Sequence, residues 1–303
     1  YNLIAIISDQ ISKRERKIPP FSLDINKSKP ILNPIVFDPG KIICDGLNAF
    51  VLSNNSASIP FNKPTNDLVI PVSDQEISSL SIKVKRGDKI LIDEEKITES
   101  FLAHPEIKLC GDKAVITQSA DTSKIKLFLI RDFSSKLTEG PIQLEVYPDD
   151  AADQKQIFNL SVIWIGKPIS LSDAEEAIKF IELIESKDVV SEIFSGSGDD
   201  IENLYNYWNK LDPTPETKFN ELMSEFYTRV DYCELNFRSL AGNGGAKSDR
   251  GKTYIKYGPP DSIDRDTDNH DKVVESWIYK KSQRKFVFVD KEGTGAFTLA
   301  NGQ

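Results

Sequence analysis

The stretch from Phe158 to Ile181, FNLSVIWIGKPISLSDAEEAIKFI, contains the change of pattern that decides how this chain folds. Apolar and polar residues alternate from Phe158 to Val162, which is typical of a half-buried β-strand. Beyond Lys167-Pro168 the apolar residues recur at helical spacing, at Ala174, Ala177, Ile178, Ile181 and Ile184. We therefore expect a domain boundary near Gly166–Leu171, with strands before it and helices after it.

Short strands separated by turns fill the chain before this boundary. Leu80–Val84 alternates apolar and polar residues, and the turn at Arg86-Gly87-Asp88 leads into Ile90–Ile92. The same pattern gives later strands at Ile125–Ile130, Ile142–Tyr147 and Phe158–Val162. Because no helical pattern lies between these strands, they predict an antiparallel β-sandwich over residues 28–168.

Helices come first after the boundary. Ser172 and Glu175 have the spacing of a capping box, and Thr214 with Pro215 is a second helix start. A long apolar stripe follows at helical spacing: Phe219, Leu222, Met223, Phe226, Val230, Cys233 and Phe237. Further strands are expected at Tyr254–Tyr257, Val273–Tyr279, Phe286–Val289 and Ala296–Leu299. Residues 169–303 are therefore predicted to form an α+β domain with helices packed on an antiparallel meander.

Length and charge narrow the class of protein. A chain of 303 residues agrees with more than one domain. The formal net charge is -9, and an acidic surface repels phosphate backbones, so we expect no nucleic-acid partner. No apolar run approaches the roughly 18 residues needed to span a bilayer, so we expect no transmembrane segment in this chain.

The three cysteines, Cys44, Cys110 and Cys233, lie far apart in the sequence. They form no CxxC pair, which excludes a zinc site of the usual spacing. We expect three buried or half-buried thiols, because free cysteine behaves as a small apolar residue. If a disulfide forms, Cys44–Cys110 is the only pair that falls within one predicted domain.

A set of motifs in the C-terminal part of the chain is more specific than these patterns. The motifs are Tyr207–Thr217, Asn220-Glu221, Tyr227–Val230, Asp249–Asp261 and Glu275–Tyr279. Together they resemble the GWxTD domain of bacterial proteins. The motif that names this family falls on Gly245–Asp249, where Ala246 takes the place of the tryptophan and Ser248 that of the threonine.

The resemblance implies an architecture and a compartment. Proteins of this family place β-sandwich domains before the GWxTD domain and are exported to the envelope. By this resemblance, residues 1–27 are the tail of an upstream β-sandwich, and the protein lies in the periplasm or at the outer-membrane surface. Tyr1 opens directly into an apolar stretch, so we expect any signal peptide or lipid anchor upstream of it. The resemblance implies no activity.

An acidic segment near the C-terminus is the strongest candidate for a metal site. Asp264, Asp266 and Asp268 stand at its first, third and fifth positions, and Glu275 stands at its twelfth. Oxygen ligands at this spacing are typical of a calcium loop. The usual glycine at the sixth position is absent, however, and both flanks have the pattern of strands. The alternative is a solvated acidic hairpin tip, and we expect no other cofactor.

No catalytic or cofactor-binding residues are predicted. The only histidines are His104 and His270, and the sequence contains no G-x-S-x-G nucleophile motif. Gly242–Ser248 resembles a phosphate-binding loop in composition, but it follows a predicted helix where that motif needs a strand.

The adjacent Asp249 and Arg250 could hold a polar ligand, although a structural role is simpler. Asp249 can satisfy backbone groups of its loop. Arg250 can pair with a carboxylate of the long helix, and Glu221 and Glu225 are the candidates.

Two functions remain open at this point. The first is a non-enzymatic cell-envelope scaffold or partner-binding protein, a component of a larger assembly with protein partners in the envelope. The second is an enzyme or carbohydrate-binding protein with a site between domains.

Overall fold

The computed structural model describes residues 2–3, 6–8, 15–17, 21–22, 30–53, 58–61, 65–119, 125–239, 244–267 and 272–302. It divides the chain into two compact units, residues 1–60 with 64–163, and residues 61–63 with 164–303. The described part is rich in β-sheet and contains five α-helices. None of these helices combines the length and the apolar composition that crossing a membrane requires.

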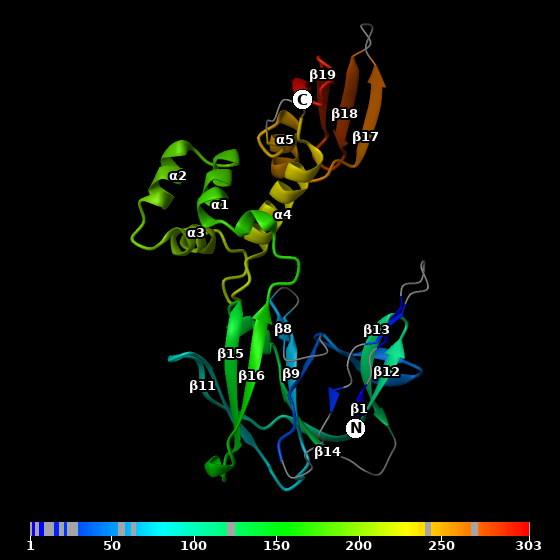
Figure 1. Cartoon of the computed structure of the whole chain (residues 1–303), viewed down its shortest axis with the longest axis vertical. Helices are drawn as coiled ribbons and strands as arrows, with labels where there is room; N and C mark the ends of the chain where they lie inside the picture. The colour runs from blue at the N-terminus through cyan, green and yellow to red at the C-terminus, as the bar shows by residue number, and fades with distance from the viewer. Residues whose placement is uncertain are drawn as a thin grey trace. The chain divides into compact units, whose positions relative to one another are not determined.

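The first unit contains a five-stranded sheet in the order β11-β10-β15-β16-β8 (Figure 1). Neighbouring strands are antiparallel, except for the parallel pair β16–β8. The strands are β8 (Ser58–Pro60), β10 (Leu80–Arg86), β11 (Lys89–Ile97), β15 (Gly140–Pro148) and β16 (Gln156–Ile163). The period of two buries one face of the sheet, where Leu80, Ile82 and Val84 are fully covered.

A second, seven-stranded sheet of this unit has the order β5-β9-β14-β12-β13-β7-β6 and is antiparallel throughout. Its strands are β5 (Ile35–Phe37), β6 (Ile42–Cys44), β7 (Leu47–Val51), β9 (Asp67–Val72), β12 (Ser100–Cys110), β13 (Lys113–Ser119) and β14 (Ile125–Ile130). Short 3-10 helices lie at η1 (Phe133–Lys136) and η2 (Ala152–Gln154).

Two short strand pairs precede these sheets. They are β1 (Asn2–Leu3) with β4 (Phe21–Ser22), and β2 (Ile6–Ser8) with β3 (Glu15–Lys17). The charged run at residues 13–17 has the pattern of a hairpin tip, but residues 15–17 form strand β3, and residues 13 and 14 lie outside the described residues.

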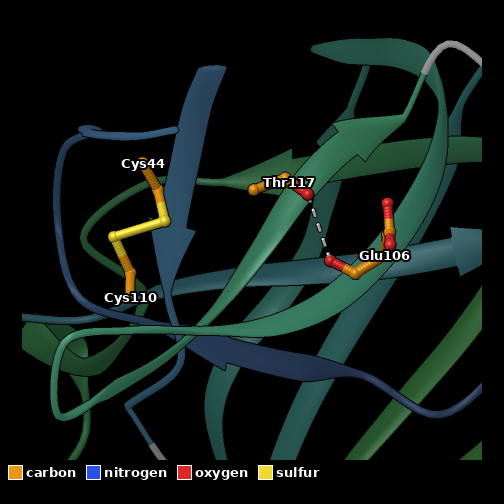
Figure 2. The surroundings of a disulfide bond; sticks show 4 residues. All are labelled: Cys44, Glu106, Cys110 and Thr117. Atoms are coloured by element: carbon orange, nitrogen blue, oxygen red, sulfur yellow. Dashed lines mark hydrogen bonds between the residues drawn. A yellow bond between two sulfur atoms is a disulfide. The ribbon is translucent and has the colours of Figure 1, made fainter. Parts of the chain in front are cut away.

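A disulfide joins two hairpins of the seven-stranded sheet (Figure 2). Cys44 ends β6 and Cys110 ends β12, so each cysteine directly precedes a two-residue turn. In the first turn Asp45 and Gly46 both have positive φ, as a tight hairpin requires. The Cα atoms of the two cysteines lie 5.9 Å apart. The expectation of three free thiols is therefore wrong, because only Cys233 is free.

Helices make up the first part of the second unit. They are η3 (Ile169–Leu171), α1 (Ala174–Phe180), η4 (Ile181–Leu183), α2 (Lys187–Phe194), α3 (Asp200–Asn209), α4 (Glu221–Asn236) and α5 (Asp249–Tyr257). Asp173 caps α1 where Ser172 was expected, and Asn220 caps α4 where Thr214 was expected. In both places the capping oxygen accepts a hydrogen bond from the third backbone N–H that follows.

Aromatic side chains of the second unit pack against one another in several places. Trp208 packs against Phe226 and Tyr227, with ring centroids 5.2 and 5.8 Å away. Phe219 packs with Phe61 and Trp164, and Tyr254 packs with Tyr232, Phe237 and Trp277.

The expected strand at Tyr254–Tyr257 is wrong, because these residues end helix α5. Their aromatic and β-branched side chains favour a strand locally. The preceding residues favour a helix instead, since Ser248 caps the helix and Asp249 places a negative charge in its first turn.

The chain ends in a four-stranded antiparallel sheet whose strands follow one another in sequence, β17-β18-β19-β20 (Figure 1). Its strands are β17 (Ser262–Thr267), β18 (Val273–Tyr279), β19 (Arg284–Asp290) and β20 (Phe297–Gly302). One face carries the fully buried side chains of Trp277 and Phe288, whose ring centroids lie 4.9 Å apart.

Candidate functional site

The motif at Gly245–Asp249 forms a tight turn between α4 and α5. A Cβ atom on Gly245 would lie 1.9 Å from the carbonyl oxygen of Cys233. A Cβ atom on Gly251 would lie 2.1 Å from the carbonyl oxygen of Gly245. Both obstacles are backbone atoms that cannot swing away, so glycine is required for the turn to lie this close to α4 and for α5 to lie this close to the turn.

Ala246, at the position of the tryptophan in the family motif, has no exposed surface. Its N–H donates to Glu234 Oε1 at 3.0 Å, which ties the turn to the last part of α4. This position therefore lies inside the fold and offers nothing to a binding partner.

Asp249 fixes the start of α5 to the last strand of the sheet. Its Oδ2 accepts a hydrogen bond from the N–H of Leu299 at 2.8 Å. The carboxylate therefore serves a backbone group, as expected, although that group belongs to β20 and not to the loop.

The adjacent Arg250 forms a buried ion pair with Glu275 of β18. Its Nη1 lies 3.4 and 3.3 Å from the two carboxylate oxygens, and the side chains are only 8% and 1% exposed. The guanidinium lies against the rings of Phe297 and Phe237, with Cζ 4.0 and 4.9 Å from their centroids. Its Nη2 donates to the carbonyl of Gly295 at 3.3 Å.

Two more donors complete the surroundings of Glu275. Arg265 Nε donates to Oε1 at 2.7 Å, and Trp277 Nε1 donates to Oε2 at 3.2 Å. Charged donors and a ring N–H thus occupy both oxygens, which offsets much of the cost of burying the carboxylate. We name Arg250, Arg265, Glu275 and Trp277 the arginine–glutamate cluster.

The prediction that Arg250 pairs with Glu221 or Glu225 is wrong. Glu225 pairs with Arg229 on its own helix at 2.8 Å, and Glu221 accepts from Thr214 Oγ1 at 2.6 Å. Arg250 lies near the start of α5 and faces the sheet, so the nearest carboxylate comes from β18.

The candidate calcium ligands do not come together. Asp264 and Asp266 alternate with Arg265 along β17, so their side chains point to the opposite face from Arg265. Arg265 faces Glu275 directly across the strand pair, which places Glu275 on the face away from both aspartates. Asp268 lies outside the described residues. Among the residues that are described, no cluster of His, Cys, Asp and Glu could hold a metal ion.

The other candidates for chemistry are dispersed. The imidazole of His104 and the whole of His270 lie outside the described part of the chain, as do Gly242 and Asn243 of the glycine-rich loop. Cys233 is fully buried, and burial raises the pKa of its thiol to about 12, which leaves it protonated and unreactive at neutral pH.

Arg265 is the member of the cluster that sequence analysis missed. Its position between two aspartates made it look like part of an acidic tip. The hairpin register was the available signal, because an arginine and a glutamate directly opposite each other on antiparallel strands stabilise the pair.

Comparison with known proteins identifies the C-terminal part of the chain. The GWxTD domain family matches residues 152–300, a span that begins in the first unit and includes β16, all five α-helices and nearly all of the last sheet. No curated protein and no solved structure matches the chain.

Proposed function

Because residues 152–300 of this chain are a GWxTD domain, we propose that the protein is a non-enzymatic scaffold or partner-binding component of an assembly in the cell envelope. The observation that carries the proposal is the arginine–glutamate cluster. Arg250, Arg265 and Trp277 all donate hydrogen bonds to Glu275, which is closed off from solvent. A catalytic acid or base needs access to its substrate, whereas this cluster supports the packing of α5 on the sheet.

The disulfide Cys44–Cys110 supports export. Disulfides form and persist in oxidising compartments and are rare where thiols are kept reduced. The expected location is therefore the periplasm or the outer-membrane surface. Thiol labelling of fractionated cells tests this part: Cys44 and Cys110 should resist alkylation in the envelope fraction until reductant is added. Full labelling of freshly lysed cells would contradict it.

We propose further that the two large sheets of the first unit pack as a β-sandwich that acts as a spacer. The apolar face of each sheet supports this arrangement, because each needs an apolar surface to cover it. Limited proteolysis tests the proposed boundary after residue 168 and should give a stable fragment that starts near Ser170. Uniform resistance along the chain would count against two modules.

Contact with partner proteins can be tested at β12. Ile107 and Leu109 share one face of this strand and are 68% and 74% exposed, unusual for large apolar side chains. A photo-crosslinking residue at Leu109 should capture a discrete envelope protein in cells. The same residue at Ile157, which is 51% exposed on the other sheet, is the matched control.

An absence of adducts at Leu109, or equal adducts at both positions, would contradict the binding surface.

The proposal that the protein is not an enzyme has its own test. The purified chain should not hydrolyse ester, peptide, glycoside or nucleotide substrates. Turnover that persists through purification and disappears on one point substitution would overturn it.

A further inference from the structure

The outer face of the five-stranded sheet carries an open groove of about 440 Å³. A volume of this size matches a small-molecule site, for which a few hundred Å³ or more is usual. The polar side chains that line it are Lys85, Arg86, Gln143, Asn159 and Ser161. They lie within the first unit and are separate from the arginine–glutamate cluster.

Strand register explains why these side chains meet. Lys85 of β10 faces Gln143 of β15, and Gln143 faces Asn159 of β16, so the three form a row across the sheet. Ser161, two residues beyond Asn159 on β16, lies on the same face. The next residues in sequence, Ile142 and Leu160, point to the buried face.

The groove contains one fixed positive charge without a counter-ion. Arg86 donates to Pro141 O at 3.2 Å, to Thr138 O and to Thr138 Oγ1, and its guanidinium packs against Gly140. All three acceptors are uncharged, and among the described residues no carboxylate forms an ion pair with Arg86. Lys85, in contrast, is neutralised by Glu145 at 2.6 Å.

The amide groups supply matched donors and acceptors beside this charge. Gln143 Nε2 donates to Asn159 Oδ1 at 3.3 Å, which orients both amides. That bond leaves the Gln143 carbonyl oxygen as an acceptor and the Asn159 NH₂ as a donor. A hydroxyl group both donates and accepts, so a polyol can bond to the two amides and to Ser161.

We propose that this groove binds an acidic saccharide, with a sugar carboxylate at Arg86 and hydroxyl groups at Gln143, Asn159 and Ser161. A guanidinium held by its neighbours loses little freedom on binding and pairs well with a carboxylate. An acidic peptide would satisfy the charge but has few hydroxyl groups to use the amide row.

The test is a titration of the isotope-labelled whole chain, followed by backbone amide NMR shifts. The probes are tri-galacturonate and its methyl ester, which keeps the ring hydroxyls but loses the charge. We expect tri-galacturonate to shift the signals of Gln143, Asn159 and Ser161, and the ester to bind about tenfold more weakly, as loss of one charged hydrogen bond implies. Raising the salt concentration should weaken only the acid.

Two variants locate the site. Asn159→Ala should weaken tri-galacturonate binding severalfold, and Asn48→Ala, the same change at an exposed position on the other sheet, should leave it unaltered. Arg86→Gln should remove the preference for the acid over the ester. Arg86 also bonds to Thr138, so the melting temperature of Arg86→Gln is measured first. If Arg86→Gln fails to fold, the comparison of Asn159→Ala with Asn48→Ala tests the proposal.

Three results would overturn the proposal. The first is equal affinity for the acid and its ester, and the second is equal weakening by Asn159→Ala and Asn48→Ala. The third is tighter binding of tri-glutamate than of tri-galacturonate, which would identify a peptide site. None of these results bears on the scaffold function, which rests on the arginine–glutamate cluster and the disulfide.

Discussion

Arg250 and Glu275, one on helix α5 and the other on strand β18, are joined by a buried ion pair whose closest atoms, Nη1 and Oε2, are 3.3 Å apart. The pair connects the helical part of the GWxTD domain to its sheet. Because both side chains are almost completely buried, neither can be rehydrated when its partner is removed.

Removing one charge of this pair should therefore destabilise the protein strongly. We expect Glu275→Gln to lower the free energy of unfolding by about 3–5 kcal/mol, since a buried arginine is left without its main counter-charge. Urea unfolding followed by tryptophan fluorescence measures the change. Arg265→Ala is the control: that side chain is 70% exposed and Glu275 remains paired with Arg250, so its loss should cost clearly less. Equal effects of the two substitutions would show that the pair is not effectively buried.

The close approach of the turn at Gly245 to helix α4 gives a second prediction. Gly245→Ala should cost about 1–3 kcal/mol or more, because the new methyl group meets the backbone carbonyl of Cys233. Gly244→Ala is a matched control one residue away, where the nearest atom is the flexible end of Glu234 at 3.0 Å. Thermal unfolding of the two variants should differ clearly, and similar melting temperatures would argue against this packing.

Reduction of the disulfide should weaken the first unit. A cross-link between cysteines 66 residues apart restricts the unfolded chain, which is worth about 4 kcal/mol in the chain-entropy model. Addition of reductant should lower the urea midpoint of wild type and leave the Cys44→Ala/Cys110→Ala variant unchanged. A wild-type midpoint that does not respond to reductant would mean that the bond contributes no stability.

Acid should remove a stabilising contribution from Asp149. Partial burial alone would raise the pKa of this carboxyl, but hydrogen bonds from Lys96, Ser79 and Ser81 outweigh it and lower the pKa to about 2. A carboxyl with a lowered pKa stabilises the fold above its unfolded pKa, and that contribution is lost as the pH falls from about 4 to about 2.

Urea midpoints measured from pH 7 to pH 2 check this prediction. Asp149→Asn should be less stable than wild type at pH 7 and should lose less stability between pH 4 and pH 2. Asp153→Asn, at an exposed position nearby, should follow the wild-type curve. A parallel decline in Asp149→Asn and wild type would contradict the assigned role.

The strands could be predicted from the sequence because the alternation of apolar and polar residues is visible within each short segment. Leu80–Val84 alternates in the printed order, and the structure places these residues in β10 with the apolar members buried. The same reliance on short segments led to a predicted strand in place of the end of helix α5, since Tyr254 and Ile255 favour a strand when considered alone. The cap at Ser248 and the stacking of Tyr254 on Tyr232, with ring centroids 4.5 Å apart, stabilise the helix instead.

The cluster could be predicted only in part, because it depends on how distant segments meet. The sequence indicated that Arg250 can pair with a carboxylate of the long helix, with Glu221 and Glu225 as the candidates. Choosing Glu275 requires knowing that α5 packs on β18. The groove at Arg86 could not be predicted for the same reason, since its row of polar side chains forms only when three strands are aligned.

The bond between Cys44 and Cys110 turns the intervening peptide into a covalent ring. A single backbone cut anywhere inside that ring leaves both pieces attached, so the nicked protein migrates at full mass until a reductant opens it. The ring also contains Phe61, which packs with Trp164 and Phe219 of the second unit. A chain nicked on either side of Phe61 thus keeps that residue tethered, whereas a fragment that begins at Trp164 has lost it altogether.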